Sequence, residues 1–336
     1  MTGREAERNG IRDSRGRRID YLRVSLTDRC SFRCLYCMPP EGAPYIPHAE
    51  ILSYEELLHL CRIAASLGIS RYKITGGEPL CRKDAVAFIR KLKTLPGVNS
   101  VSLTTNGALL APLVPELAEA GVDGITVSLD AFTQETFSRV TRSDARLDDI
   151  LHAMERSRNT GIGLKINMVP LKGINDAEIV PLTRYAMSKG CHIRFIELMP
   201  VGRGKDCAGI LRVEVQAMLE KTFGPLTPFR ERIGNGPAEY LRADGHCGGI
   251  GFIAPLSHVF CERCNRVRLT SAGFLKTCLH HEDGCDLKVL IRSGVSDAGL
   301  SSAIRNAIQT KPRTHNFAAQ AVSGEETPFL MNHLGG

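Results

Sequence analysis

The chain has 336 residues, of which 43% are hydrophobic and 24% are charged. This balance excludes a disordered or fibrous protein, and the length allows one barrel-sized domain or two ordinary domains. The 43 lysines and arginines outnumber the 36 aspartates and glutamates, which gives a formal net charge of +7 and favours anionic ligands. Because the positive charge is not gathered in one tract, an anionic small molecule is as good a candidate ligand as a nucleic acid.

Residues 1–14 are polar, and we expect them to be flexible. They contain no apolar region of the kind that a secretory signal requires, and their acidic residues fit poorly with a transit peptide. The apolar runs of the chain fall well short of the roughly 20 residues that a membrane-spanning helix needs. We therefore expect a soluble, cytoplasmic protein with no membrane partner.

From residue 20 to about residue 200, short β-branched runs alternate with longer helical patterns, which is typical of βαβ units. The expected strands are 21–26, 71–75, 101–105, 124–129, 164–169 and 192–198. The expected helices are near 53–68, 83–95, 110–120, 147–160 and 175–189. Six such units are too few for a closed eight-stranded barrel, so the pattern predicts an α/β fold with a partial (β/α)6 TIM-type barrel over residues 15–230.

Beyond residue 205 the pattern changes to segments rich in glycine and proline, with short strands and one helix near 295–309. The expected strands are 238–243, 248–254, 266–270 and 274–278. We expect residues 231–336 to form a C-terminal α+β extension that covers the open side of the barrel.

The chain contains twelve cysteines. Because the cytosol keeps thiols reduced, we expect ligands, nucleophiles or core residues rather than disulfides. Spacing separates two triplets, Cys30, Cys34 and Cys37 near the start, and Cys261, Cys264 and Cys278 near the end. The other six are expected to be small buried hydrophobes: Cys61, Cys81, Cys191, Cys207, Cys247 and Cys285.

The first triplet has the spacing CxxxCxxC and directly follows the first expected strand, at the end where α/β barrels place their active sites. Three thiolates from one loop can hold a [4Fe-4S] cluster and leave one iron free to bind a small molecule. A zinc site completed by a distant residue is the alternative, although zinc ligands more usually come in CxxC pairs.

The first triplet, within YLRVSLTDRCSFRCLYCMP, and the following loop ITGGEPL resemble the radical S-adenosylmethionine (SAM) superfamily. The resemblance implies a barrel of the radical SAM kind, a cluster whose open iron binds SAM, and reductive cleavage of SAM to a 5′-deoxyadenosyl radical. It also implies SAM contacts, near the adenine at Tyr36 and elsewhere at Gly76, Gly77, Glu78, Ser128 and Met199.

The second triplet is a CxxC pair followed by thirteen residues and a third cysteine. Spacing alone leaves a zinc ribbon open, with His280, His281 or Cys285 as a fourth ligand. However, near-contiguous matches from about residue 13 to the end resemble the GTP 3′,8-cyclase family of molybdenum cofactor biosynthesis. In that family this pattern holds a second [4Fe-4S] cluster, which leaves an iron free for the guanine of GTP.

Basic residues interrupt the expected strands, although buried parallel strands are usually apolar throughout. They are Arg23, Arg71, Lys73, Lys165, Arg194, Arg266 and Arg268. Residues two apart face one side of a strand, so Arg71 with Lys73, and Arg266 with Arg268, predict a triphosphate cradle if those sides face the lumen. Snorkelling at strand ends, or pairing with structural carboxylates, is the alternative for any one of them.

The family resemblance also implies roles for individual residues. Contacts to GTP are implied for Arg23, Lys73, Thr104, Lys165, Arg266, Val267 and Arg268, and the strand pattern adds Arg71 and Arg194. Catalytic roles are implied for Arg266, Arg268 and the C-terminal Gly335 and Gly336. Lys73 stands where the family more often has arginine, which keeps the charge but loses the bidentate fork; Ser31 stands where the family usually has asparagine.

The activity that the resemblance implies is that of a lyase, which converts GTP to (8S)-3′,8-cyclo-7,8-dihydroguanosine 5′-triphosphate. It implies two [4Fe-4S] clusters and SAM as cofactors, an external electron donor, a downstream cyclic pyranopterin monophosphate synthase, and a homodimer. One alternative is another radical SAM enzyme with an auxiliary cluster, such as a peptide-modifying one. The other is a zinc-ribbon protein that binds nucleic acid, which leaves the first triplet and the GGEP loop unexplained.

Overall fold

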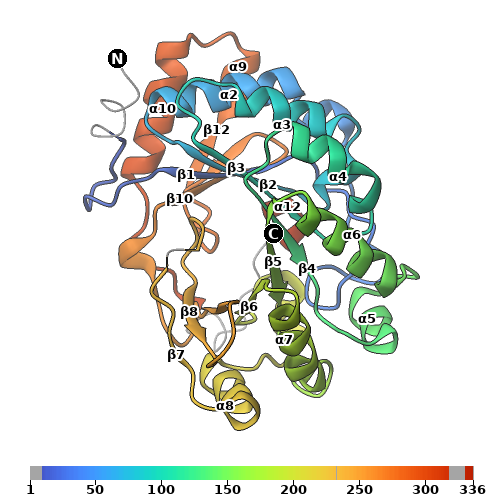
Figure 1. Cartoon of the computed structure of the whole chain (residues 1–336). Helices are drawn as coiled ribbons and strands as arrows, with labels where there is room; N and C mark the ends of the chain where they lie inside the picture. The colour runs from blue at the N-terminus through green and yellow to red at the C-terminus, as the bar shows by residue number, and fades with distance from the viewer. Residues whose placement is uncertain (1–9, 232, 318–329, 336) are drawn as a thin grey trace.

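The computed structural model describes residues 10–231, 233–317 and 330–335, in which twelve strands form one curved sheet (Figure 1). The strand order is β12-β11-β10-β1-β2-β3-β4-β5-β6-β9-β8-β7. The central strands are β1 (Tyr21–Ser25), β2 (Arg71–Thr75), β3 (Ser100–Thr105), β4 (Gly124–Ser128), β5 (Gly163–Met168) and β6 (His192–Ile196). Each pairs in parallel with the next, which confirms the predicted α/β class and its six central strands.

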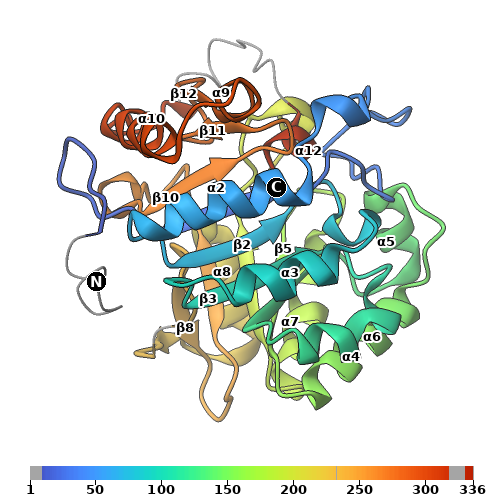
Figure 2. The same ribbon diagram turned by 90° about the horizontal axis from the view of Figure 1, so that it is seen from above.

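Helices lie around the outside of the curved sheet (Figures 1 and 2). The helices expected from periodicity are α2 (Tyr54–Ser66), α3 (Ala85–Lys93), α4 (Leu110–Glu119), α6 (Leu147–Asn159), α7 (Ile179–Ser188) and α10 (Asp297–Gln309). A capping box begins α2, because the Ser53 hydroxyl accepts from the Glu56 amide and the Glu56 carboxylate accepts from the Ser53 amide. Gly68 follows α2 with a φ of +92°, a conformation that favours glycine.

Several short or exposed elements were not expected. The helices are α5 (Gln134–Thr141), α8 (Arg212–Phe223), α9 (Leu287–Arg292) and α12 (Met331–Leu334), and the short 3-10 helices are His48–Glu50, Pro79–Cys81, Asp176–Glu178, Gly202–Asp206 and Cys261–Arg263. In α8 only Val215 and Leu219 are buried, so the helix has a weak apolar period. No helix in the described part of the chain has both the length and the apolar character that crossing a membrane requires.

The C-terminal strands extend the barrel sheet at both edges. β9 (Ile250–Ile253) pairs in parallel with β6, and β10 (Arg266–Leu269) pairs in parallel with β1. Antiparallel strands then finish the edges: β8 (Glu239–Arg242) with β7 (Thr227–Pro228), and β11 (Phe274–Lys276) with β12 (Gly284–Asp286). Because β9 and β10 lie in a linear strand order and do not pair with each other, the barrel stays open.

The N-terminal segment is packed from residue 11 onward, so the expected flexible region does not extend to residue 14. Ile11 and Asp13 are 3% and 4% exposed, and the Ile11 amide donates to the Leu67 carbonyl at 3.0 Å. Residues 1–9 of the expected flexible region lie outside the described residues.

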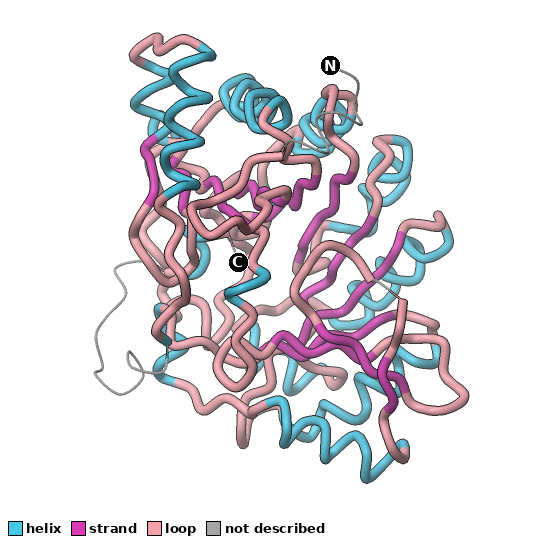
Figure 3. Tube along the Cα trace, turned by 90° about the vertical axis from the view of Figure 1, so that its left-hand side faces the viewer, coloured by secondary structure: helices cyan, strands magenta, loops and turns pink. Residues whose placement is uncertain are grey.

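The C-terminal segment lies inside the ring of strands (Figures 1 and 3). Gly335 is next to Ser25 and Thr75, at the carboxyl ends of β1 and β2. These are the strand ends where barrels of this class place their active sites.

The isolated cysteines divide by location. Cys61 and Cys191 are buried, as expected for small hydrophobes. The same expectation is wrong for Cys81, at the end of the 3-10 helix Pro79–Cys81, and for Cys247, in a loop, since both are exposed. Cys207 and Cys285 are half-buried.

Candidate active site

A cavity inside the curved sheet brings both cysteine triplets together, although some 220 residues separate them in the sequence. Most of the residues proposed from the sequence line it. They are Arg23, Cys30, Cys34, Tyr36, Cys37, Lys73, Gly76, Gly77, Glu78, Thr104, Ser128, Lys165, Arg194, Met199, Cys261, Cys264, Arg266, Arg268, Cys278 and Gly335.

Three of the proposed residues are not placed at the cavity. Arg71 forms an ion pair with Asp20 at 2.9 Å, which is the structural alternative considered for the strand cations. Val267 is 1% exposed in the core, because its side chain alternates with those of its two arginine neighbours. Gly336 lies outside the described residues.

The loop that carries the first triplet is held against α5. The Arg33 and Leu35 amides donate to the Thr141 and Val140 carbonyls at 2.8 and 3.0 Å, which fixes the backbone between the cysteines. The three thiols form no disulfide and are half-buried.

Burial has a marked effect on the thiols of the first triplet. It raises the pKa of Cys30 to about 11 and the pKa of Cys37 to about 12, and it raises that of Cys34 well above its usual value. These thiols are therefore protonated near neutral pH in the free chain, and they must release protons when they bind iron.

The two glycines of the GGEP loop allow it to pack closely on the cysteine loop. A β-carbon on Gly76 would lie 2.7 Å from the Thr27 carbonyl oxygen, and one on Gly77 would overlap the carbonyl of Arg29. The Gly77 and Glu78 amides each donate at 2.7 Å to these same carbonyls. The resemblance implied SAM contacts at both glycines; the contact observed is with backbone, and both glycines also line the cavity.

Glu78 is a buried carboxylate at this loop. It accepts hydrogen bonds from the Leu80 amide at 3.0 Å, the Thr105 hydroxyl at 2.8 Å and the Asn106 amide at 2.7 Å. Burial raises the pKa of Glu78 to about 7 in spite of these bonds. The Asn106 side chain also donates to Ser31 at 3.0 Å, so it joins the two loops.

Asp130 is a second buried carboxylate in the cavity, and the sequence analysis missed it. It accepts from the Tyr36 hydroxyl at 2.7 Å and from the Val169 amide at 2.8 Å. Burial raises the pKa of Asp130 to about 6. Its place directly after the fourth strand was the available signal, because Asp130 and Asn106 both follow strands at their carboxyl ends.

Buried cations occupy another part of the cavity. Lys73 and Arg194 both donate to the Thr126 hydroxyl, at 3.0 and 3.1 Å. Within the described ranges, neither these two residues nor Lys165 forms an ion pair. Burial, followed by the neighbouring cations, lowers the pKa of Lys73 well below its usual value and that of Lys165 to about 8. Cations buried together without carboxylates fit an anionic ligand.

The second triplet lies beside cations that lower the pKa of one of its thiols below the usual value, whereas burial dominates at the first triplet. Burial acts to raise the pKa of Cys264, but Arg266 and Lys311 lower it to a net value of about 6. Burial, followed by Arg23 and Arg266, lowers the pKa of Arg268 well below its usual value.

Both donor sets fit iron-sulfur clusters. All six are thiols at the wall of one cavity, and thiolates are the usual ligands of such clusters. Across the described residues, no three His, Cys, Asp or Glu side chains converge closely enough to hold a single metal ion. A [4Fe-4S] cluster takes its thiolates on separate irons, so it does not need three donors about a single ion.

Comparisons with known proteins place the chain in a class. A model described as Radical SAM superfamily matches residues 24–186, and one described as Molybdenum Cofactor Synthesis C matches residues 191–317. The crystal structure of SuiB from Streptococcus suis, bound to S-adenosylmethionine, superimposes with a TM-score of 0.63 at 13% identity, over 87% of this chain and 68% of SuiB. The chain is therefore a radical SAM protein, with SAM and an iron-sulfur cluster as its cofactors.

Relatives narrow the class to a family. A GTP 3′,8-cyclase of Clostridium perfringens is 38% identical over 97% of this chain and 100% of its own length. Those of Heliobacterium modesticaldum and Paracoccus denitrificans are 41% and 42% identical, over 96% of this chain and 99% and 95% of their own lengths. The chain belongs to the GTP 3′,8-cyclase family.

Proposed function

We propose that this chain is a radical SAM lyase that converts GTP to (8S)-3′,8-cyclo-7,8-dihydroguanosine 5′-triphosphate, the first step of molybdenum cofactor biosynthesis. The observation that carries the proposal is a single cavity that holds two thiol triplets together with Lys73, Lys165 and Arg194, which form no ion pair within the described residues. Family membership indicates the reaction, and the cavity contains candidate residues for binding each of its components.

At the first site, Cys30, Cys34 and Cys37 hold the cluster. When bound, this cluster and SAM would supply the radical chemistry that abstracts the hydrogen atom on C3′ of GTP. Tyr36 and the GGEP loop bind SAM, with further contacts from residues that line the same cavity: Gly76, Gly77, Glu78, Ser128 and Met199.

At the second site, Cys261, Cys264 and Cys278 hold a second [4Fe-4S] cluster, which leaves an iron for the guanine base. The Arg266 and Lys311 charges, which favour the Cys264 thiolate, support cluster ligation there. A zinc ribbon would instead require four ligands about one ion.

The buried cations bind the triphosphate. Lys73, Lys165 and Arg194 have the charge for it, and arginine forks suit phosphate oxygens. The Thr104 hydroxyl is buried and, in the described part of the chain, has no hydrogen-bond partner, so it is available to the substrate. Arg23, Arg266 and Arg268 stabilise the charge that develops during ring closure, and Gly335 lies beside Arg23. Gly336, which lies outside the described residues, shares the proposed catalytic role of the tail.

The proposal also includes the partners and the cellular location of the protein. They comprise an external electron donor, a downstream cyclic pyranopterin monophosphate synthase, a homodimer, a location in the cytoplasm, and no nucleic-acid or membrane partner. The partly apolar cavity lies inside the curved sheet and holds the substrate next to the radical source, while the cofactors carry the difficult chemistry.

The test is an anaerobic incubation of the reconstituted chain with GTP, SAM and dithionite, followed by mass spectrometry. We expect 5′-deoxyadenosine and the cyclised nucleotide together, with ATP in place of GTP as the control that gives no cyclised product. Formation of 5′-deoxyadenosine without cyclised nucleotide would retain the superfamily and overturn the proposed substrate. Zinc in place of iron, with no acid-labile sulfide, would favour the zinc-ribbon alternative.

A further inference from the structure

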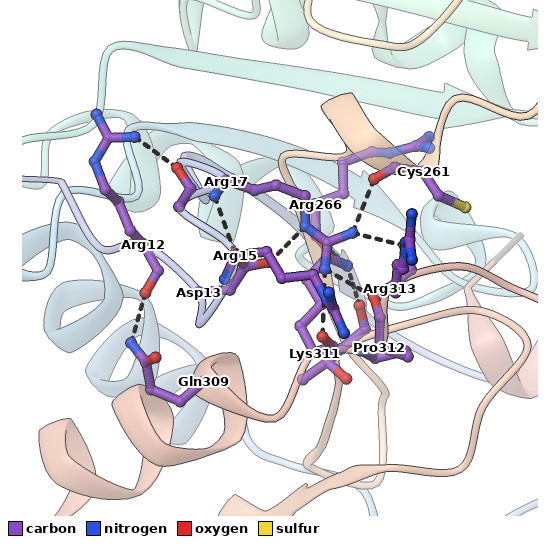
Figure 4. Close-up of polar contacts among 12 residues, drawn as sticks. Arg12, Asp13, Arg15, Arg17, Cys261, Arg266, Gln309, Lys311, Pro312 and Arg313 are labelled. Atoms are coloured by element: carbon purple, nitrogen blue, oxygen red, sulfur yellow. Dashed lines mark hydrogen bonds and ion pairs between the residues drawn. The ribbon is translucent and has the colours of Figure 1, made fainter.

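Arg17 uses all five of its side-chain N–H donors, and they reach three separate parts of the chain (Figure 4). Its Nε pairs with Asp13 Oδ2 at 2.5 Å, and Nη1 donates to the carbonyl of Cys261 at 2.8 Å. The remaining donors reach the three consecutive carbonyls of residues 311–313, at 3.3, 2.7 and 3.2 Å. Arg17 therefore connects the N-terminal segment to one of the proposed cluster ligands, Cys261, and to the C-terminal segment 311–313.

Asp13, four residues before Arg17, holds the Arg17 guanidinium in place. The side chains of Arg17 and Asp13 are 7% and 0% exposed, so the pair is shielded from water. The other oxygen of Asp13 accepts from the Arg15 and Arg17 amides, both at 3.0 Å, which fixes the turn between them. A planar guanidinium fixed in this way presents its donors in one defined direction.

Lys311 belongs to the segment 311–313 that Arg17 contacts, and its side chain lies next to the segments of the other two cysteines of the triplet. The Lys311 side chain is buried, and its ammonium donates to the Arg266 carbonyl at 2.9 Å and to the Thr277 carbonyl. Thr277 immediately precedes Cys278, and Arg266 is two residues after Cys264. Arg17 thus reaches one cysteine directly and the segments of the other two through Lys311.

We propose that Arg17, oriented by Asp13, is a positioning residue for the second cysteine triplet. This inference rests on the proposed second cluster. It adds hydrogen bonds from Arg17 and Lys311 that fix the backbone of the three cysteines, and so the relative positions of their thiols. Contacts of this kind orient metal ligands, and their loss typically lowers metal affinity or activity by about 10- to 100-fold.

The experiment compares Arg17→Ala and Arg17→Lys with Arg12→Ala in the full chain after anaerobic reconstitution. Lysine keeps the charge but loses the fork. Arg12 is the matched control, because it is exposed and its side chain donates only locally, to the Gly16 carbonyl at 2.7 Å. Iron, acid-labile sulfide and the electron paramagnetic resonance (EPR) spectrum of the reduced protein are measured, together with 5′-deoxyadenosine formation.

We expect about eight irons per chain in the wild type and in Arg12→Ala, which corresponds to two [4Fe-4S] clusters. Arg17→Ala should lose roughly half of the iron and the EPR signal of the second cluster, while its SAM cleavage stays close to the wild-type rate. Arg17→Lys should retain more iron than Arg17→Ala but show a changed second-cluster signal.

Full iron content with an unchanged EPR spectrum in Arg17→Ala would overturn the inference and leave the proposed function intact. Equal loss of both clusters would also contradict it, since it would mean a general failure of folding. About four irons in the wild type would instead overturn the second cluster itself, and this inference with it.

Discussion

A β-carbon added to Gly335 would lie 2.7 Å from the hydroxyl oxygen of Thr75, closer than such atoms approach. Gly335 also has a φ of +77°, in the region that residues with side chains rarely adopt. Its carbonyl accepts a hydrogen bond from Arg23 at 3.0 Å. The C-terminal tail therefore reaches the cavity because residue 335 has no side chain.

Gly335→Ala is expected to lower the rate of GTP cyclisation by about tenfold or more, because strain of roughly 1 kcal/mol and the clash with Thr75 displace the carbonyl from Arg23. Iron content should not change. Gly294→Ala is the matched control: Gly294 has a φ of +78° but no neighbour within 4 Å of an added β-carbon. Equal rates for the two variants would contradict a role for the tail.

Substitutions in the two triplets are expected to have different effects on SAM cleavage and on GTP cyclisation. Cys278→Ala should still form 5′-deoxyadenosine but no cyclised nucleotide, whereas Cys30→Ala should form neither. Cys61→Ala should form both, with a loss of about 1 kcal/mol in stability, because Cys61 is 0% exposed in the core. Product analysis by mass spectrometry distinguishes these results, and a fully active Cys278→Ala enzyme is the result that refutes the second site.

Lys73→Met is expected to raise the free energy of unfolding by about 1 kcal/mol, because it removes a buried cation that has no carboxylate partner. The same change should weaken GTP binding by roughly tenfold. Calorimetry measures both quantities. Arg71→Met is the control, since Arg71 pairs with Asp20 outside the cavity: it should lower stability and leave GTP affinity unchanged. Unaltered GTP affinity in Lys73→Met would argue against the triphosphate cradle.

GTP affinity is expected to fall as the pH rises from about 7 to about 9. Burial, followed by Arg194, lowers the pKa of Lys165 to about 8, so the charged form that attracts phosphate is lost across this window. Lys73 acts in the same direction, while His192 is neutral there, because burial lowers its pKa. Lys165→Arg keeps its charge and should flatten the dependence. Binding titrations at several pH values test this, and an unchanged slope in the variant would count against it.

The lowered pKa of Lys165 also predicts the pH dependence of stability in the free chain. The folded form loses its proton at about pH 8, and the unfolded chain does so near the ordinary lysine value of 10.5. The unfolded state therefore binds more protons between these values, and the Lys165 contribution to stability should rise with pH across that window. Chemical unfolding of the wild type and of Lys165→Met, from pH 7 to pH 10, measures the difference.

Hydrophobic periodicity and residue spacing were sufficient to predict the local features of this protein. The six central strands, the helix that begins at Ser53, and both cysteine triplets could be predicted because each depends on neighbours within a few positions. The pairing of β9 with β6 and of β10 with β1 could not, because nothing local records which distant edge a strand joins.

The same limit applies to individual side chains. Strand alternation placed Arg71 and Lys73 on one face, but only the fold shows that Asp20 pairs with the first. Likewise, Asp130 and Arg17 gain their roles from partners 39 or more residues away, at Val169, Tyr36 and Cys261.

The most direct measurement is the fate of the hydrogen atom on C3′ of GTP. Anaerobic turnover with C3′-deuterated GTP should give 5′-deoxyadenosine that carries the deuterium, whereas C8-deuterated GTP should give unlabelled 5′-deoxyadenosine. Unlabelled 5′-deoxyadenosine from the C3′-deuterated substrate would contradict the proposal that this cavity places C3′ of GTP beside the radical source.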